Sequence, residues 1–400
     1  MQAKRLLIVV GGVPHPTEGA SVVLFHKYID GFRQAGYDIL TLILAQPDNA
    51  RPERLAEWRA AMEGPKFQVR VAHSPAFVHS GRRRCTFDHA ALAPVRAEIE
   101  AFRPDAALLF DLASAWAMDG WSIGRRTVWL GDLNFDTYLY HTRYARREGQ
   151  GNWRHFLMGH WRSWQWKRIY ARVLRGCERI VVASKSSEAR LARLGLEARY
   201  MPYPWPSEPA DPAALGPKPA KPTFFFFGQL AGLGSRSAFH LMTEGIYPRL
   251  REAFGPGGFE ILIGGRGDLP GWVVDGLNNR PELRYLGFVE DLDRVMGGCH
   301  AVLAPIDVPV GNRSRILTAL AKGMLVVAHT NTALGNPDLV DGQSCWLAST
   351  PEEFVDRLRR AVEQTDKSAA VALGGQRVYK QLFAPEVAVP ALIRAVAAGL

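Results

Sequence analysis

The feature that most constrains this 400-residue chain is an order of short apolar runs, glycine-containing loops and helical segments that occurs twice. In the first half, an apolar run at residues 4–10 precedes a glycine- and proline-rich loop at 11–19, a helical segment at 21–35 and a second run at 39–45. This order opens a parallel α/β sheet. It restarts at residues 223–227, so the sequence predicts two consecutive parallel α/β domains.

The rest of each half continues the alternation. In the first half, the patterns predict strands at 67–72, 106–110, 127–130 and 180–183 and helices at 89–102 and 187–194. In the second half, they predict strands at 260–263, 284–286, 301–304 and 325–328 and helices at 238–254, 292–296, 351–363 and 387–398. The proline-dense segment between the halves is typical of a linker. We therefore expect an N-terminal domain at 1–203, a linker at 204–222 and a C-terminal domain at 223–383. A ligand is expected in the cleft between the domains.

The charge of the chain is uneven. Residues 1–205 contain 30 lysines and arginines against 19 acidic residues, whereas the remainder is close to neutral. The first half is therefore expected to meet an anionic partner, such as phospholipid headgroups, a phosphorylated substrate or nucleic acid. The four cysteines have no paired spacing, which is typical of a reducing compartment. No apolar run approaches the roughly 20 residues that span a bilayer, so we expect a soluble or peripheral cytoplasmic protein.

Residues 309–330 predict an anion-binding helix start. Arg313 and Arg315 stand where an apolar-periodic helix begins, and Gly323 stands where it ends, before the predicted strand at 325–328. A helix N-terminus offers unpaired N–H groups and partial positive charge, and arginine adds forked donors for phosphate oxygens. The alternative is a surface helix with two solvated arginines.

Several segments together resemble a known family. They are residues 227–228, 263–265, 286–292, 311–317 and 323–328. In order and spacing they are similar to nucleotide-sugar glycosyltransferases of the GT-B fold, in the group-1 or family-4-like branch. The resemblance implies an α/β fold with two Rossmann-like parallel α/β domains facing across an interdomain cleft. It also implies that residues 384–400 form a helix that crosses back to the N-terminal domain.

The resemblance implies a donor site. In the family, the segment like 287–292 holds the nucleobase through backbone groups, the position of Arg315 neighbours the diphosphate, and the glycine loop approaches the phosphates. The implied donor-binding residues are Gly11, Gly12, Gly19, Gly228, Gly265, Phe288, Val289, Arg313, Arg315 and Thr318. No cofactor or metal is implied, because the nucleotide-sugar is a co-substrate.

The chain departs from the family at three places. Val310 and Thr318 stand where two glutamates are usual, and the second of these normally binds the ribose hydroxyls. Leu133 stands where a histidine is expected near the sugar. Only Arg236 follows the Gly228 loop, where a cationic pair is common.

Residues 131–136 resemble the family segment H-N-x-E, which follows a strand and faces the sugar. Asp132 and Asp136 are the candidate catalytic carboxylates, and Asn134 could hydrogen-bond the sugar. The alternative for each is a loop cap or an Asx-turn. His15 and His329 also follow strands, where histidines are more often structural. Asp291 and Asp293 form a D-x-D pattern, but acids favour a helix start there, so we predict no metal site. The sequence also contains no zinc, P-loop or serine-hydrolase motif.

Residues 153–175 interleave aromatic and basic side chains. Trp161, Trp164, Lys167 and Arg168 are the candidates for a membrane or acceptor surface. A core helix with a basic polar face is the alternative, and nucleic acid is the least favoured partner. The Arg82–Arg84 run adds to the positive charge.

The sequence thus favours a metal-independent, hexosyl-type glycosyltransferase, retaining by resemblance, in bacterial polysaccharide or glycoconjugate biosynthesis. Its expected partners are a nucleotide-sugar donor, a glycan, lipid-linked or anionic acceptor, and an anionic membrane surface on the inner face of the cytoplasmic membrane. Two alternatives stay open. One is a non-catalytic GT-B-like partner subunit, and the other is a nucleotide-sugar epimerase of the same fold.

Overall fold

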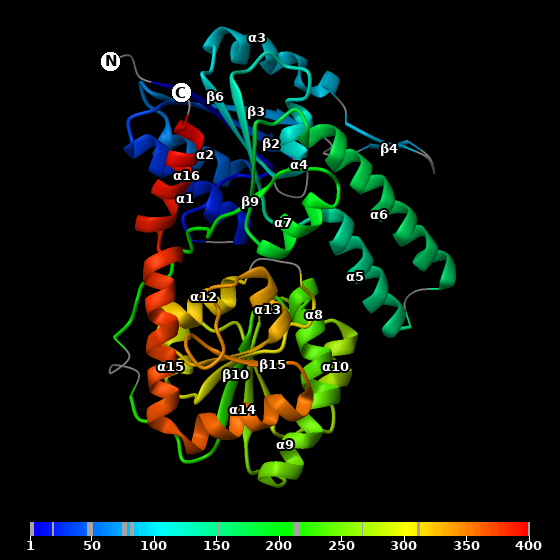
Figure 1. The fold of residues 1–400 in the computed structure, drawn as a ribbon, viewed down its shortest axis with the longest axis vertical. Helices are drawn as coiled ribbons and strands as arrows, with labels where there is room; N and C mark the ends of the chain where they lie inside the picture. Colours follow the sequence, from blue (N-terminus) through cyan, green and yellow to red (C-terminus); the bar gives the residue numbers. More distant parts are fainter. Residues whose placement is uncertain are drawn as a thin grey trace. The chain divides into compact units, whose positions relative to one another are not determined.

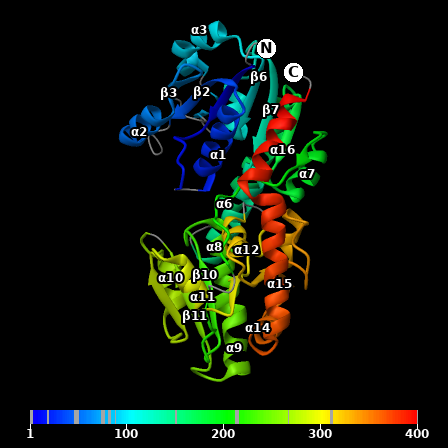
Figure 2. The ribbon, with the colours of Figure 1, turned by 90° about the vertical axis from the view of Figure 1, so that its left-hand side faces the viewer.

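A computed structural model of the chain describes residues 4–17, 20–45, 51–73, 78–80, 84–87, 89–149, 152–211, 216–265, 267–309 and 313–398. The chain forms two compact units (Figures 1 and 2). The first unit comprises Met1–Phe135, His160–Pro206 and Pro385–Leu400, and the second comprises Asp136–Gly159 and Ser207–Ala384. Each unit is built around its own parallel sheet, as the sequence predicts.

The sheet of the first unit has the strand order β3-β2-β1-β6-β7-β8-β9, and every pair is parallel. The strands are β1 (Arg5–Val10), β2 (Asp38–Ala45), β3 (Phe67–His73), β6 (Ala106–Phe110), β7 (Arg125–Leu130), β8 (Arg179–Val182) and β9 (Arg199–Tyr200). A separate antiparallel hairpin joins β4 (Val78–Ser80) to β5 (Arg84–Thr86). The central strand β6 is apolar and buried throughout, and its neighbours β1 and β7 are buried beyond their first residues, as expected for a parallel sheet covered by helices on both faces.

The helices of the first unit connect these strands. They are α1 (Ala20–Gln34), α2 (Pro52–Met62), α3 (Ala93–Phe102, after a 3₁₀ turn at His89–Leu92), α4 (Asp111–Ala117), α7 (Lys185–Ala192) and α16 (Pro385–Ala397). The final helix α16 packs against α1 in both views (Figures 1 and 2). Gly31 of α1 is the point of closest approach, because a Cβ there would lie 2.1 Å from Cγ1 of Val389.

The sheet of the second unit has the strand order β12-β11-β10-β13-β14-β15, again all parallel. Its strands are β10 (Thr223–Phe227), β11 (Glu260–Gly264), β12 (Leu283–Gly287), β13 (Ala301–Ala304), β14 (Val326–His329) and β15 (Trp346–Ala348). Its helices are α8 (Leu233–His240), α9 (Tyr247–Phe254), α10 (Gly271–Leu277), α11 (Leu292–Gly297), α12 (Ser314–Ala321), α13 (Thr330–Gly335), α14 (Pro351–Glu363) and α15 (Thr365–Val378). Short π-helices occupy Leu241–Ile246 and Tyr379–Phe383.

The single helix predicted at residues 238–254 is divided in the structure. The π-helix Leu241–Ile246 separates α8 from α9, and Pro248 lies in the first turn of α9. Proline has no N–H to donate, so the regular i→i−4 hydrogen bonding is interrupted at this point.

Two antiparallel helices, α5 (Asn134–Arg147) and α6 (Trp153–Leu174), form a long hairpin. At one end Tyr170 donates to Oδ1 of Asn134 (2.8 Å), and at the other Arg146 lies over the ring of Phe156 (5.7 Å). The tip of the hairpin, Asp136–Gly159, belongs to the second unit, whereas the sequence analysis assigned all of 1–203 to one domain. Tyr144 explains the difference, since its side chain is buried in the core of the second unit.

Both sheets reverse their strand order at one place, between β1 and β6 in the first unit and between β10 and β13 in the second. At such a switch point the adjacent loops leave in opposite directions. This opens a crevice beyond the carboxyl ends of the strands, where α/β proteins bind ligands. The functional residues are therefore expected in the loops that follow these strands.

The contact between α1 and α16 gives a first prediction. Gly31→Ala should lower the thermal unfolding midpoint, with a cost of about 1–3 kcal/mol from overpacking against Val389 that outweighs the gain in helix propensity. Gly64→Ala, which meets no atom within 4 Å, is the control. Adding Val389→Ala should recover part of the loss. If Gly31→Ala unfolds at the same temperature as the control, α16 does not pack on α1 as described.

Candidate functional site

The switch point of the second sheet is lined by glycines. Gly228 follows β10 with a φ of 139°, a conformation that favours glycine, and Gly287 ends β12 with a φ of 71°. The N–H of Gly265 donates to the carbonyl of Gly287 (2.9 Å), and a Cβ at Gly265 would lie 2.9 Å from Cγ of Leu230. The backbone at the ends of β10 and β11 is therefore closely packed against neighbouring groups.

Arg315 lies at this switch point. It is in the first turn of α12, and its guanidinium lies 5.2 Å from the ring centroid of Phe226 on β10. Its Nη2 donates to Oγ of Ser235 in the first turns of α8 (2.5 Å), and a Cβ at Gly228 would lie 2.7 Å from the same nitrogen. Glycine at position 228 is thus what gives the guanidinium its space.

The other terminal nitrogen of Arg315, Nη1, is buried and has no hydrogen-bond partner among the residues that the structure describes. Burial and then the neighbouring charge of Arg313 lower the pKa of Arg315 to about 10, so the guanidinium stays charged at neutral pH. A charged nitrogen that is buried without an acceptor carries a free-energy cost, which an anionic ligand would remove.

Arg313 is placed differently. Its side chain is buried, and Nη2 donates to the carbonyl of Val308 in the loop after β13 (2.7 Å). This contact holds the loop that leads into α12. Thr318 lies one turn after Arg315 on α12 and is half-buried. Val310 lies outside the described residues, as does Gly19.

Phe288 and Val289 follow β12 at the same edge of the second sheet. The side chain of Phe288 is 58% exposed, whereas Cγ2 of Val289 packs against the backbone at Gly264. An exposed aromatic ring beside open backbone groups is a surface on which a planar ring can stack. The structure therefore brings Gly228, Gly265, Phe288, Val289 and Arg315 to one edge.

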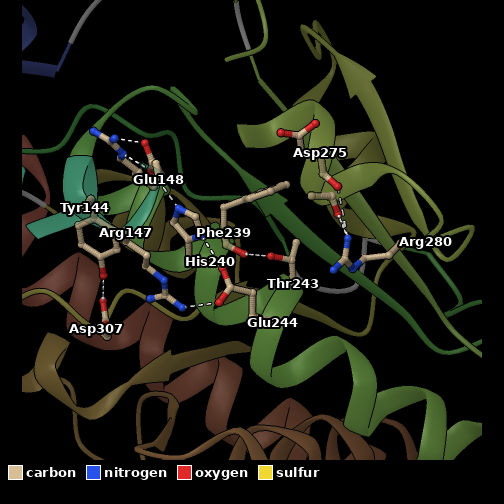
Figure 3. A network of polar contacts seen from close by, with 12 residues as sticks. Tyr144, Arg147, Glu148, Phe239, His240, Thr243, Glu244, Asp275, Arg280 and Asp307 are labelled. Atoms are coloured by element: carbon tan, nitrogen blue, oxygen red, sulfur yellow. Dashed lines mark hydrogen bonds and ion pairs between the residues drawn. The ribbon is translucent and has the colours of Figure 1, made fainter. Parts of the chain in front are cut away.

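Glu148 holds Arg236 in an ion pair away from this edge. Figure 3 shows Glu148 within the network of polar contacts around His240. The guanidinium meets both carboxylate oxygens of Glu148, with Nε donating to Oε1 at 2.5 Å. Glu148 also contacts Nε2 of His240 (2.9 Å), and Nδ1 of His240 contacts Glu244 (2.7 Å). Arg147 completes the chain of contacts by pairing with Glu244.

These contacts, together with the hydrogen bond from Tyr144 to Asp307 (2.9 Å), join the hairpin tip to α8 and to the loop after β13. Burial raises the pKa of Glu148, but hydrogen bonds from Arg236 and His240 outweigh burial, and the pKa lies below its ordinary value. The ionised carboxylate is therefore the form that the folded state prefers.

Glu148→Gln should destabilise the second unit by about 2–4 kcal/mol, because it leaves the charge of Arg236 buried without its partner. The folded-state pKa of Glu148 is depressed, so its contribution is present above the unfolded pKa and is lost as the pH falls through the folded pKa. The difference in unfolding midpoint between wild type and variant should thus be largest near pH 7 and shrink in acid.

Glu244→Gln is the matched control for this variant, since Glu244 also contacts His240 but its side chain is 49% exposed. It should cost about 1 kcal/mol or less. Equal losses for the two variants would contradict the role given to the buried pair.

The switch point of the first sheet brings together loops from three adjacent strands. Gly11 and Gly12 follow β1, Asp111 follows β6, and Asp132 follows β7. A Cβ at Gly11 would meet no atom within 4 Å, so this stretch of backbone has open space around it. Asp132 is exposed.

Asp111 is the residue of this edge that sequence reasoning missed. It has a φ of 67°, which is uncommon outside glycine and costs backbone strain. Burial raises the pKa of Asp111 to about 6; a hydrogen bond from the backbone of Gly131 opposes this, and the charge of Asp132 adds to it. Strain and a raised carboxyl pKa at a strand end are typical of functional sites. The signal in the sequence that could have identified Asp111 is its position directly after a buried strand.

The remaining residues of the 131–136 segment lie elsewhere. The side chain of Asn134 accepts a hydrogen bond from Tyr170 of α6, which ties the two helices of the hairpin together. Asp136 lies on α5 within the tip assigned to the second unit. Asp111 and Asp132 follow the adjacent strands β6 and β7, whereas Asn134 and Asp136 belong to helix α5.

Asp111→Asn should change how stability depends on pH. The folded-state pKa of Asp111 is raised, so its stabilising protonation is present below the unfolded pKa and is lost as the pH rises through about 6. Asparagine cannot ionise and tolerates positive φ. The variant should gain about 2 kcal/mol relative to wild type between pH 4 and pH 7.5, measured by denaturant unfolding. Parallel pH profiles for the two proteins would rule out a perturbed Asp111.

The histidines and the D-x-D acids have structural contacts. Nδ1 of His15 accepts from the N–H of Thr17 (3.2 Å), and Nδ1 of His329 accepts from Asn331 (3.1 Å). Asp291 caps α11 by accepting from the N–H of Arg294, and Asp293 pairs with Lys322 (2.7 Å). Within the described ranges, no three metal-ligating side chains gather in one place.

The four surface candidates lie on α6. Trp161 and Trp164 are exposed and stacked, with ring centroids 4.9 Å apart, and Arg168 lies over the ring of Trp164. Lys167 lies over the ring of Phe135 on α5 (5.6 Å). In the part of the chain that the structure describes, no helix has the length and apolar character needed to cross a bilayer.

Comparison with known proteins shows which family model and which solved structures this chain resembles. Residues 221–364 match the family model described as Glycosyl transferases group 1. Similar solved structures include sucrose-phosphate synthase from Thermosynechococcus elongatus (13% identity, TM-score 0.66, covering 99% of this chain and 100% of that one). They also include HepE from Anabaena in complex with UDP-glucose (16%, 0.61, 99% and 100%) and WaaG, a glycosyltransferase involved in lipopolysaccharide biosynthesis (12%, 0.60, 98% and 100%). A search of curated proteins gives no match.

The chain has the GT-B fold of two Rossmann-like domains, and residues 221–364 of its second unit match the group 1 glycosyltransferase model. The resemblance and the fold class given by the sequence are thereby confirmed. The matched segment includes the candidate residues Gly228, Gly265, Phe288 and Arg315.

Proposed function

We propose that this protein transfers a sugar from a nucleotide-sugar to a hydroxyl group of an acceptor, without a metal ion. The donor assignment rests on the guanidinium of Arg315, which lies against Gly228 at the switch point of the second sheet. Its buried nitrogen Nη1 has no acceptor among the described residues. A diphosphate oxygen is the partner that such a nitrogen requires. The N-terminal end of α12 adds partial positive charge at the same place.

The proposed reaction uses this charge on the leaving group. The bond between the anomeric carbon and the diphosphate oxygen breaks, and the acceptor oxygen bonds to the anomeric carbon. The departing nucleoside diphosphate keeps the electron pair, and Arg315 stabilises the negative charge that develops. The proton of the acceptor hydroxyl passes to a carboxylate or to the departing phosphate.

The rest of the donor is assigned to the neighbouring loops. The exposed ring of Phe288 and the backbone at Val289 would take the nucleobase, and Thr318 would face the ribose. Threonine offers one hydroxyl where a glutamate offers two oxygens, so we expect the ribose to contribute less binding energy than a glutamate would give. Arg313 supports the site by holding the loop before α12.

On the acceptor side, we assign proton transfer to Asp132 and Asp111. A carboxyl that stays protonated near pH 6 can donate a hydrogen bond to a sugar oxygen, while its ionised neighbour accepts the hydroxyl proton. The excess positive charge of residues 1–205 favours an anionic or lipid-linked glycan as acceptor. A role in bacterial polysaccharide or glycoconjugate assembly, on the cytoplasmic side of the membrane, fits this choice. Hexosyl donors and retention of configuration follow from the family resemblance alone.

A thermal-shift panel with UDP, GDP, ADP, CMP and their common sugars tests the proposal. A ligand at 100 times its dissociation constant adds about 2.7 kcal/mol to the stability of the folded state. We expect one nucleoside diphosphate to raise the unfolding midpoint and its sugar to be transferred or slowly hydrolysed. Binding without turnover would favour the non-catalytic subunit, and release of a free epimeric sugar would favour the epimerase. No shift with any nucleotide would refute the donor site.

Arg315→Gln should weaken the binding of that nucleotide by about 10- to 100-fold, because charge-assisted hydrogen bonds are worth roughly 1.5–3 kcal/mol. The readout is the dissociation constant from calorimetric titration. Arg294→Gln is the control, since Arg294 is on the adjacent α11 with a side chain 82% exposed. An unchanged affinity in the Arg315 variant would show that the phosphate binds elsewhere.

A further inference from the structure

The helix α6 has two apolar faces, and only one of them is used for packing. One face carries Ser163, Trp166, Tyr170 and Val173, which are buried. This face meets α5 and the core of the first unit, with the Phe135 and Tyr170 rings edge to face at 5.1 Å. A core-packing helix needs no more than this one apolar stripe.

The opposite face of α6 is apolar and exposed. Trp153, Leu157, Trp161 and Trp164 are three or four residues apart, so they line one side of the helix. Their exposed fractions are 63%, 56%, 43% and 45%. Elsewhere in the described ranges, large exposed apolar side chains occur singly, with no second element contributing more than one. Single exposed apolar residues are ordinary, whereas an exposed stripe marks an interaction surface.

The charge of α6 indicates the chemistry of its partner. The helix contains no acidic residue, and its basic residues are Arg154, Arg162, Lys167, Arg168 and Arg172. The Arg168 guanidinium lies 4.7 Å from the ring centroid of Trp164, which itself stacks on Trp161. Arg168 therefore places a permanent positive charge beside two stacked indole rings. Indoles favour the boundary between water and acyl chains, and arginines there contact lipid phosphates.

We propose that the exposed stripe of α6, formed by Trp153, Leu157, Trp161 and Trp164, docks the protein on an anionic lipid bilayer. The indoles enter the headgroup boundary and the flanking arginines bind lipid phosphates. The docking is peripheral and reversible. This surface is independent of the donor site, so it stands or falls separately from the proposed transfer reaction.

Charge complementarity selects this occupant over the alternatives. A second copy of the chain would bring one acid-free, basic helix against another, and like charges would repel. A protein partner would need a groove that is both acidic and apolar along the length of the helix. An anionic bilayer supplies both the negative charge and the apolar layer along the whole length of a helix.

Co-flotation of the full-length protein with vesicles tests the proposal. One set contains phosphatidylglycerol and phosphatidylcholine, and the other contains phosphatidylcholine alone. We expect binding to the anionic vesicles at low ionic strength that falls as salt is raised, since the charges lie within reach of screening ions. Trp161→Ser together with Trp164→Ser should reduce the partition coefficient about 10-fold or more.

Leu334→Ser, another exposed apolar position on a helix outside α6, is the matched control and should bind as wild type does. Arg162→Gln with Arg168→Gln should lower binding to anionic vesicles and abolish most of its salt dependence. Circular dichroism and the thermal unfolding midpoint check that each variant is folded. No flotation of the wild type, equal binding by the tryptophan variant, or tighter binding to a single-stranded oligonucleotide at the same salt would each overturn the proposal.

Discussion

The close approach of the Arg315 guanidinium to Gly228 is the interaction on which the proposed donor site depends. Parallel pairing sends the ends of β10, β11 and β13 to one edge, and the reversal of strand order between β10 and β13 opens that edge. Helix α12 then places Arg315 beside β10, where only glycine leaves it space. One terminal nitrogen donates to Ser235, and the other has no hydrogen-bond partner among the described residues.

Much of this arrangement could be predicted from the sequence, because it depends on local patterns. Short apolar runs located the strands at 106–110, 223–227 and 301–304 at their observed limits. The start of α12 beside Arg315 could also be predicted, since helical periodicity is a short-range signal. The role of Asp111 could not, because neither its positive φ nor its burial leaves a mark in the neighbouring residues.

The hairpin of α5 and α6 shows a second limit. Helical periodicity indicates that a helix forms, but a helix with apolar residues on both faces does not reveal which face is packed. The structure buries Trp166 and exposes Trp161 and Trp164, although all three are tryptophans within six positions. Long-range packing against Phe135 and the core of the first unit selects the buried face. Long-range contacts also hold Arg236, the one cation that the sequence places after the Gly228 loop, in an ion pair with Glu148.

The central claim is that Arg315 recognises the diphosphate of the donor. The most direct test is a coupling measurement, in which calorimetric titration compares the nucleoside diphosphate with its nucleoside monophosphate on wild type and on Arg315→Gln. Only the part of the affinity that comes from the terminal phosphate and its charge should depend on Arg315. We predict that the advantage of the diphosphate over the monophosphate is largely lost in the variant. An advantage of the same size in both proteins would contradict the claim.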